Sequence, residues 1–280
     1  MEDDITIPQG RKEKKFGMDA LLVAGSVLLA GLIIAGSIVS VTQKLSSPAV
    51  TAPVAKDTTT AGAGAQQPTD PTITMDQVKG LFDGKNITFG KKDAKVLFVE
   101  FSDPSCPYCH VAAGQNPNLN KQVGTQFVLV KDGGTYVAPV PEMRKLVDAG
   151  KAGFVWIYTN GHGNGEMGTK ALYCAFEKKK FWEVHDLLMS EAGYNLLNTD
   201  VKNDKTKAGV IADFLKNVVS ASDMKSCLES GKYDSRIADD TAIATTFGLS
   251  GTPKFLINTE QFKGAYSFTD MQPSIDKYLK

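Results

Sequence analysis

The sequence predicts an α/β domain built in layers, with a block of helices inserted between its strands. Two almost continuously apolar runs, 96–101 and 154–158, have the composition of strands that are buried on both faces. A helical pattern fills the middle of the chain, and two further strands, 254–258 and 261–266, precede a last helix at 268–279. This order of strands and helices indicates a sheet that is covered by helices.

The helices of the middle block are predicted from apolar residues at helical spacing. They occupy residues 167–178, 181–189, 208–219, 222–229 and 233–247. Within the second of them, Phe181 and Trp182 are expected in the core and His185 on the helix surface. A short helix is also expected at 141–149, because proline is favoured at the start of a helix.

The composition of the chain restricts the class of protein. The chain has 280 residues, an apolar content of 42% and 31 basic against 31 acidic side chains. These values suit one globular domain with appendages. A formal net charge of zero gives no global electrostatic reason to bind nucleic acid, so no nucleic-acid partner is predicted.

An uncharged apolar run of 22 residues occupies positions 20–41. As a helix it would be about 33 Å long, enough to cross a bilayer. Four basic residues precede the run and one follows it closely, so the positive-inside rule keeps the N-terminus in the cytoplasm and exports the rest. A cleaved signal peptide is the alternative, but the run exceeds the usual apolar length of about 7–15 residues and no clear A-x-A site follows.

The N-terminal part is therefore predicted as a cytoplasmic segment at 1–17, a transmembrane anchor at 18–41 and a disordered linker at 42–71. The linker is rich in alanine, threonine, proline and glycine, and it cannot bury enough apolar surface to offset the entropy of ordering. The globular domain follows at 72–280. It would lie outside the cytoplasm, where disulfide bonds persist.

The tetrapeptide Cys106-Pro107-Tyr108-Cys109 is typical of a thiol–disulfide exchange site. Pro107 suits the first position of a helix, so Cys106 is expected to cap that helix at the positive end of its dipole, where a thiolate is stabilised. Cys109 lies about one turn further along, within bonding reach. We expect Cys106 to be the exposed, attacking sulfur and Cys109 the buried sulfur that resolves a mixed disulfide.

His110 gives the same motif a second interpretation, because C-x-x-C-H is the attachment signature of a c-type haem. A haem would need His110 as an axial ligand, and it would not explain the acidic residue in the strand before the motif. A zinc site would need a second ligand pair, which Cys174 and Cys227 do not provide as a C-x-x-C. His110 is then expected to tune the thiolates or to lie on the surface. No metal or organic cofactor is implied.

Glu100 interrupts the apolar strand six residues before Cys106. A carboxylate in such a strand is costly unless it has a task or a partner. Beneath the cysteines it could relay a proton to or from Cys109. The alternative is a glutamate at the strand edge that faces solvent.

Cys174 and Cys227 lie on two helices of the predicted block, and neither has a partner in a C-x-x-C motif. In an exported domain, a structural disulfide that clasps the block is expected. The alternative is a pair of buried thiols, which pack as small apolar groups.

Three separated motifs, "VEFSDPSCPYC", "FWEVHDLL" and "GTPKFLIN…GAYSF", resemble the DsbA-type thiol–disulfide oxidoreductases of the thioredoxin superfamily. The resemblance runs from about residue 72 to the C-terminus. It implies a thioredoxin-like fold with a helical insertion at about 165–247. It also implies that Pro253 is a cis-proline against the disulfide, that Thr252 offers backbone hydrogen bonds to a substrate strand, and that Glu100 is the buried acid.

The chain departs from the family pattern at two places. Pro107 and Tyr108, which together with His110 would tune the redox pair, differ from the Pro-His of the best-known strong oxidants. A segment at about 115–140 also looks longer than the family norm, and a loop there could restrict substrates or meet a partner. Its residues 126–130 and 135–138 flank Lys-Asp-Gly-Gly, a hairpin signal.

The sequence as a whole predicts a single-pass protein of the cytoplasmic membrane whose C-terminal domain works outside the cytoplasm. That domain would be a thiol–disulfide oxidoreductase that forms disulfides in exported, thiol-containing proteins. By resemblance, a quinone-linked membrane partner would reoxidise it. A reductase or isomerase would use the same thiol pair, since direction depends on reduction potential and partner. A non-catalytic client-binding module of the same fold is the alternative from another class.

Overall fold

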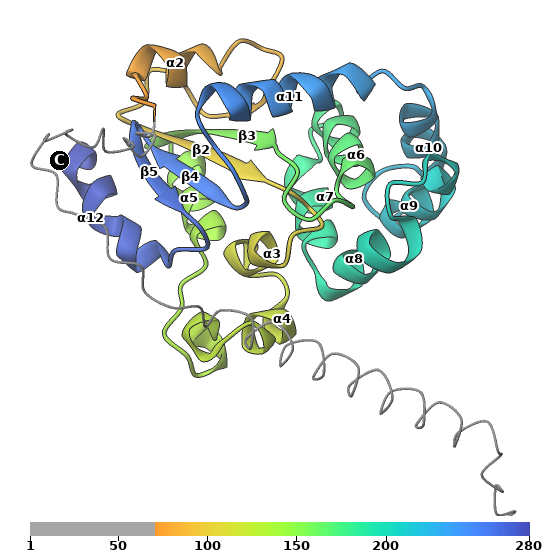
Figure 1. The fold of residues 1–280 in the computed structure, drawn as a ribbon, viewed down its shortest axis with the longest axis horizontal. Coiled ribbons are helices and arrows are strands. Elements are labelled where there is room, and N and C mark those ends of the chain that lie inside the picture. The colour runs from red at the N-terminus through yellow and green to blue at the C-terminus, as the bar shows by residue number, and fades with distance from the viewer. Residues whose placement is uncertain (1–70) are drawn as a thin grey trace, which may run out of the picture. The chain divides into compact units, whose positions relative to one another are not determined.

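The computed structural model describes residues 71–280 (Figure 1). The predicted anchor at 18–41, the segment before it and the linker up to residue 70 lie outside the described residues. Among the helices of the described part, none is both long and apolar enough to cross a membrane.

A five-stranded mixed sheet lies at the centre of the domain, in the order β1–β3–β2–β4–β5. The neighbours β2 (Val96–Ser102) and β3 (Ala152–Tyr158) run parallel and are buried at every residue. β1 (Ile87–Phe89) pairs antiparallel with β3, while β4 (Lys254–Ile257) and β5 (Glu260–Lys263) continue antiparallel beyond β2. The apolar runs of β2 and β3 follow from helices on both faces of the sheet.

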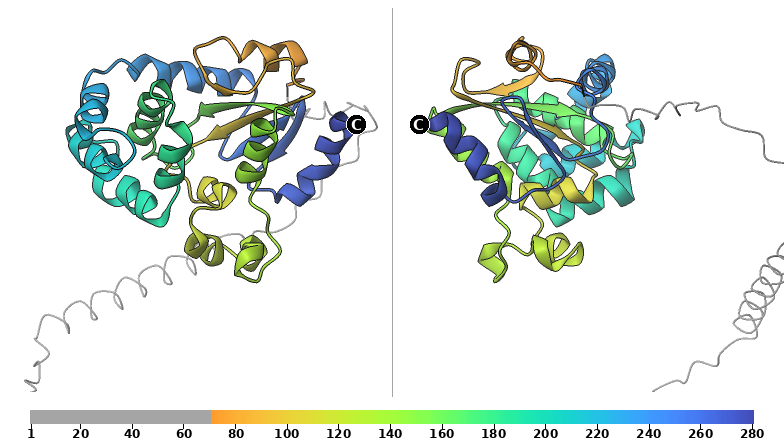
Figure 2. Two further views of the ribbon diagram at one scale, coloured as in Figure 1. Left: turned by 180° about the vertical axis from the view of Figure 1, so that it is seen from behind. Right: turned by 60° about the vertical axis from the view of Figure 1, so that its left-hand side comes forward.

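Each face of the sheet has its own helical layer (Figure 1, Figure 2). On one face, α2 (Met75–Gly80) and α11 (Asp234–Thr246) form a smaller core with the side chains of β2 that point toward them. On the other face, α5 (Pro139–Asp148), α12 (Phe268–Leu279) and the middle helices form the larger core. The thioredoxin-like α/β class that the sequence predicts agrees with this arrangement.

The middle helices form a block beside the sheet, at the side where α6 and α10 are labelled in Figure 1. Its members before α11 are α6 (Glu166–Glu177), α7 (Phe181–Leu188), α8 (Glu191–Asn195), α9 (Ala208–Leu215) and α10 (Ala221–Glu229). All five helices predicted for the block are present, with ends shifted by a few residues. The short α8 and the π-turn after it were not predicted, because so few residues give no clear periodicity.

The β-hairpin predicted around Lys-Asp-Gly-Gly is wrong. Thr125–Phe127 and Val130–Asp132 are single 3₁₀ turns, and the ladder is reduced to an isolated bridge between Leu129 and Tyr136. Leu129 and Tyr136 fold into a small apolar cluster with Val111 of α3 (Pro107–Ala113) and do not alternate along a strand pair. A helix that the sequence did not reveal, α4 (Pro117–Gln122), precedes the turns, and Figure 2 shows this segment projecting from the domain beside α3.

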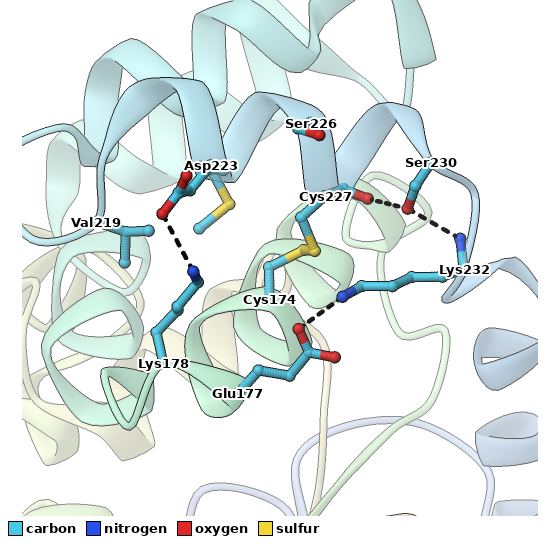
Figure 3. A pocket seen from close by; sticks show the side chains of 10 residues that line it. Cys174, Glu177, Lys178, Val219, Asp223, Ser226, Cys227, Ser230 and Lys232 are labelled. Atoms are coloured by element: carbon cyan, nitrogen blue, oxygen red, sulfur yellow. Dashed lines mark hydrogen bonds and ion pairs between the residues drawn. A yellow bond between two sulfur atoms is a disulfide. The ribbon is translucent and has the colours of Figure 1, made fainter.

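A disulfide joins Cys174 of α6 to Cys227 of α10, with 6.1 Å between the two Cα atoms (Figure 3). Surface ion pairs lie on either side of it, Lys178–Asp223 at 3.1 Å and Lys232–Glu177 at 2.6 Å. Exposed pairs of this kind contribute little to stability, so the covalent bond is the main clasp between the two helices.

We expect the double variant Cys174→Ser/Cys227→Ser to lower the free energy of unfolding by about 2–4 kcal/mol. The bond closes a loop across 53 residues and thereby restricts the unfolded chain. Urea denaturation followed by circular dichroism measures the loss. The thiol reactivity of Cys106 should stay as in the wild type, and an unchanged unfolding free energy would show that the clasp is not structural.

Candidate active site

The site lies where β2 ends and α3 (Pro107–Ala113) begins. Cys106 is the N-cap of α3 with an extended backbone, and Pro107 is its first helical residue. Asp103 fastens the short connection between them, because its buried carboxylate accepts hydrogen bonds from Ser105 and from the backbone N–H groups of Gly161 and His162. The connection is therefore held to the loop that follows β3.

Both active-site cysteines are free thiols in this structure, and their environments differ. The pKa of Cys106 is lowered to about 6, first by a hydrogen bond from the Cys109 thiol and then by Thr252 and the backbone N–H groups of Tyr108 and Cys109, against the opposing effect of burial. Cys106 retains only 4% exposure, so its sulfur is less accessible than the sequence suggested. It is nevertheless the sulfur that carries negative charge near neutral pH.

Cys109 has the opposite character. Its side chain is fully buried, and burial together with the neighbouring Cys106 raises its pKa well above the ordinary value for a thiol. The backbone N–H of Asp103 lies 3.4 Å from its sulfur. Cys109 therefore keeps its proton near neutral pH, and it needs a base before it can attack a mixed disulfide.

The loop before β4 lies beside Cys106, because β4 is the antiparallel neighbour of β2 and begins where β2 ends. Its Thr252–Pro253 peptide bond is cis, and the Thr252 carbonyl oxygen lies 3.5 Å from Cys106 Sγ. Gly161 supports the loop at close range, since a Cβ at that position would overlap the Thr252 side chain. Thr252 thus lies against Cys106 although the two are 146 residues apart in the chain, and the cis-Pro253 follows it directly.

Glu100 lies in the interior on β2, six residues before Cys106. It is fully buried, and its two carboxylate oxygens have no hydrogen-bond partner among the described residues. Burial raises its pKa above the ordinary value, while His185 and the hydroxyl of Ser102 partly oppose the rise. The alternative of a solvent-facing glutamate at a strand edge is wrong, because β2 is a central strand.

The surface role considered for His110 is also wrong, because its ring is completely buried. Its Nδ1 lies 2.7 Å from the Met189 carbonyl and its Nε2 lies 2.8 Å from the Pro104 carbonyl. Burial lowers its pKa to about 4, although both carbonyls favour the charged form. With both ring nitrogens against backbone oxygens, His110 is not placed to bind a haem iron.

His185, expected on the helix surface, is buried to 1% exposure. It shares the apolar face of α7 with Phe181, Val184 and Leu188, at the spacing of one side of a helix. That spacing could have revealed its burial, but its polar character suggested the surface. Phe181 and Trp182 are core residues as predicted.

A shallow hollow of about 410 Å³ opens between Tyr108 of the cysteine motif and the cis-proline loop. Its lining includes Tyr108, Phe127, Thr252 and Tyr266. Tyr108 and Tyr266 are both 44% exposed, and the Phe127 ring meets Tyr108 edge-on with centroids 5.8 Å apart. Phe127 and Tyr266 were not predicted, because they reach the site from segments far apart in sequence.

Comparison with known proteins agrees with the fold. A family profile described as Thioredoxin matches residues 140–277, which begin after the cysteine motif. Disulfide bond formation protein D of Bacillus subtilis is 21% identical over 198 residues, which cover 68% of this chain and 76% of that relative. The oxidised crystal structure of BdbD from Bacillus subtilis matches with a TM-score of 0.51 at 20% identity, covering 70% of this chain and 94% of that one.

Other relatives carry the similar region as one part of a longer chain. The Na(+)/H(+) antiporter NhaA 3 of Salinispora tropica is 24% identical over 191 residues, which cover 66% of this chain but only 24% of the antiporter. The chain thus spans about a quarter of the length of the antiporter that it matches. Taken together, the chain carries a thioredoxin-like domain, and the proteins similar to it include disulfide bond formation protein D and the thiol-disulfide exchange protein alpha-DsbA2 of Wolbachia pipientis.

We expect iodoacetamide to alkylate Cys106 with a pH midpoint of about 6, because only the thiolate reacts. In Cys109→Ala the midpoint should move to higher pH, since that change removes the hydrogen bond that lowers the Cys106 pKa most. Mass spectrometry of timed samples gives the rate at each pH. The same midpoint in both proteins would mean that Cys109 does not stabilise the thiolate.

Glu100→Gln should stabilise the fold at neutral pH by about 1–3 kcal/mol, because glutamine has nearly the same shape but cannot carry the charge that burial disfavours. Folding raises the pKa of Glu100, so the folded state binds this proton more tightly than the unfolded chain does. The protonated carboxyl therefore favours folding at pH values below the ordinary pKa of 4.5. This contribution is lost as the pH rises through the folded-state pKa. The gain from glutamine should therefore be larger at neutral pH than at about pH 4. Urea denaturation at both pH values tests this, and a destabilised variant at neutral pH would contradict it.

Proposed function

We propose that this protein is an extracytoplasmic thiol–disulfide oxidoreductase that forms disulfide bonds in exported proteins through Cys106 and Cys109. A substrate thiolate would attack Cys106 Sγ of the oxidised pair and break the Cys106–Cys109 bond. A mixed disulfide forms, and Cys109 leaves as a thiolate that takes up a proton. A second substrate thiolate then displaces Cys106, so two electrons pass from the substrate to the enzyme.

The observation that carries this proposal is the opposite character of two adjacent sulfurs. Cys106 has a pKa of about 6 and faces the cis-proline loop, whereas Cys109 is buried with a pKa well above its ordinary value. A structural thiol pair needs no such difference. An exchange site needs one sulfur that attacks and leaves readily and a second that resolves.

The lowered pKa of Cys106 also favours an oxidase over a reductase. A thiolate stabilised in the reduced enzyme makes its disulfide more oxidising. A value of about 6 lies between the pKa values of about 7 and about 3.5 in thioredoxin and in a strongly oxidising DsbA. An oxidant of intermediate strength is the direct expectation, with a reductase or an isomerase as the alternative.

Location and partners complete the proposal. The apolar run at 18–41, with basic residues before it, would tether the domain at the outer face of the cytoplasmic membrane. The substrates would be exported proteins with free thiols. A quinone-linked membrane protein would reoxidise the cysteine pair, as the resemblance to DsbA-type proteins implies.

The reduction potential of the pair tests the direction of the reaction. The full chain is equilibrated in glutathione buffers, and the oxidised fraction of Cys106 and Cys109 is read by alkylation and mass. We expect a potential between about −230 and −120 mV. A value at or below about −270 mV would assign the protein to the reductases.

The Cys106→Ser variant tests the alternative that the protein is a non-catalytic client-binding module. It should abolish exchange with glutathione while the Cys174–Cys227 disulfide stays intact. If wild-type Cys106 does not exchange, or if Cys106→Ser keeps full activity toward exported proteins, the protein is a client-binding module.

A further inference from the structure

We propose that His185 and Asp186 form a proton path between the buried Glu100 and solvent, on the side of the sheet covered by α5 and α7. The inference rests on the proposed function and deepens it. It assigns two positioning residues, which act on the sulfur chemistry through Glu100.

The path begins in a line of buried polar groups on one face of the sheet. Glu100 and Ser102 of β2 are opposite Trp156 and Tyr158 of β3 in the parallel ladder. Alternation along a strand places all four side chains on the same face. Each of them has a buried polar atom without a hydrogen-bond partner among the described residues.

Such atoms destabilise a fold when they are left unsatisfied. Packing alone would not select four of them side by side within the larger core. Ser102 directly precedes Asp103, whose backbone N–H lies 3.4 Å from Cys109 Sγ, so the line ends beside the buried cysteine.

His185 continues the line from α7. Its Nε2 is also buried and unpartnered among the described residues, while its Nδ1 lies 3.1 Å from the Asp186 carboxylate. A carboxylate accepts, so Nδ1 carries the hydrogen and Nε2 is left as a base. Phe181 stacks on the ring and Trp182 meets it edge-on, with centroid distances of 5.6 and 5.5 Å, which fixes its orientation.

Asp186 is the outer end of the path. Its side chain is 37% exposed and pairs with Arg144 of α5 at 3.3 Å. Both residues line an open hollow of about 280 Å³ between α5 and α7. A proton that reaches Asp186 therefore meets solvent, whereas Glu100 and His185 have almost no exposure of their own.

The charged and titratable groups around His185 come from four elements. Glu100 lies on β2 opposite Trp156, whose ring meets Phe181, and Phe181 stacks on His185. His110 lies on α3, and Asp186 and Arg144 lie on the outer side of His185 on α7 and α5. His110 is engaged by two backbone carbonyls. Glu100 on the inside and Asp186 on the outside are thus the two carboxylates that His185 can connect.

The proton balance closes over one catalytic cycle. When the enzyme is reoxidised, the Cys109 proton passes to Glu100 and then to His185 Nε2, while His185 releases its Nδ1 proton through Asp186 to water. When a substrate is oxidised, Cys109 leaves as a thiolate, and one proton returns along the same groups. The inward step restores the starting tautomer of His185, so the path is reset after each turnover.

The reaction of the reduced full chain with an aromatic disulfide, 5,5′-dithiobis(2-nitrobenzoic acid), separates the two sulfurs. Attack by Cys106 releases one coloured thiolate, and resolution by Cys109 releases a second. We compare the wild type with Glu100→Gln, His185→Gln and Asp186→Asn. Asp148→Asn is the matched control, because Asp148 also pairs with Arg144 but does not contact His185. His162→Gln controls for the loss of an exposed histidine.

The first release should stay unchanged in all variants. The second should slow by about 100-fold in Glu100→Gln and by about tenfold or more in His185→Gln and Asp186→Asn, in line with the loss of a general base. In these three variants its rate should also rise about tenfold per pH unit, following the thiolate fraction of Cys109. In the wild type and both controls it should depend only weakly on pH.

A second phase in Asp186→Asn and His185→Gln that matches the wild type in rate and pH profile would overturn the inference. If His185→Gln slows both phases, its fold is disturbed, and the half-exposed Asp186→Asn decides the question. Absence of the first phase in the wild type would instead contradict the proposed function.

Discussion

The reactivity of the site depends on the hydrogen bond that the Cys109 thiol donates to Cys106. Cys109 can donate because burial holds its proton, and this bond lowers the Cys106 pKa more than any other contact. The N-terminal amides of α3 add to the effect. A buried sulfur thus makes its neighbour a thiolate, and the same burial leaves Cys109 in need of a base. We infer that Glu100, together with the proton path through His185 and Asp186, is the base that takes the proton of Cys109.

The sheet places these groups through simple alternation. Leu97, Val99 and Phe101 pack against α2 and α11, so the intervening Glu100 and Ser102 point toward α3 and α7. Polar groups in this position weaken the larger core. The cost is offset by the aromatic side chains around them, among them Phe154 and Phe181, and by the disulfide that clasps α6 to α10. The domain therefore combines a stable frame with a destabilising line of polar atoms beneath its reactive sulfur.

Local features of the site could be predicted from the sequence, whereas features made by distant contacts could not. Cys106 and Pro107 define a helix start by themselves, and the structure has that cap. The continuous apolar runs identified β2 and β3 because both strands are covered on two faces. The hairpin prediction is wrong because Leu129 and Tyr136 pack inward against α3 and do not form a strand pair. The expected surface position of His185 is wrong, because its place on the apolar face of α7 decides its burial despite its polar side chain. Phe127 and Tyr266 come to line one hollow with Tyr108 and Thr252 only once the chain has folded.

The central claim, that Cys106 attacks and Cys109 resolves, is tested most directly by trapping. In Cys109→Ala, Cys106 can still attack a disulfide bond of a client protein and release one of its thiolates, and the mixed disulfide that forms cannot be resolved from the enzyme side. Cells that produce this full-length variant are quenched with acid, and its adducts are separated before and after reduction. The account predicts disulfide-linked adducts that disappear on reduction and are absent from Cys106→Ala/Cys109→Ala. Equal adducts in both variants, or none in Cys109→Ala, would contradict it.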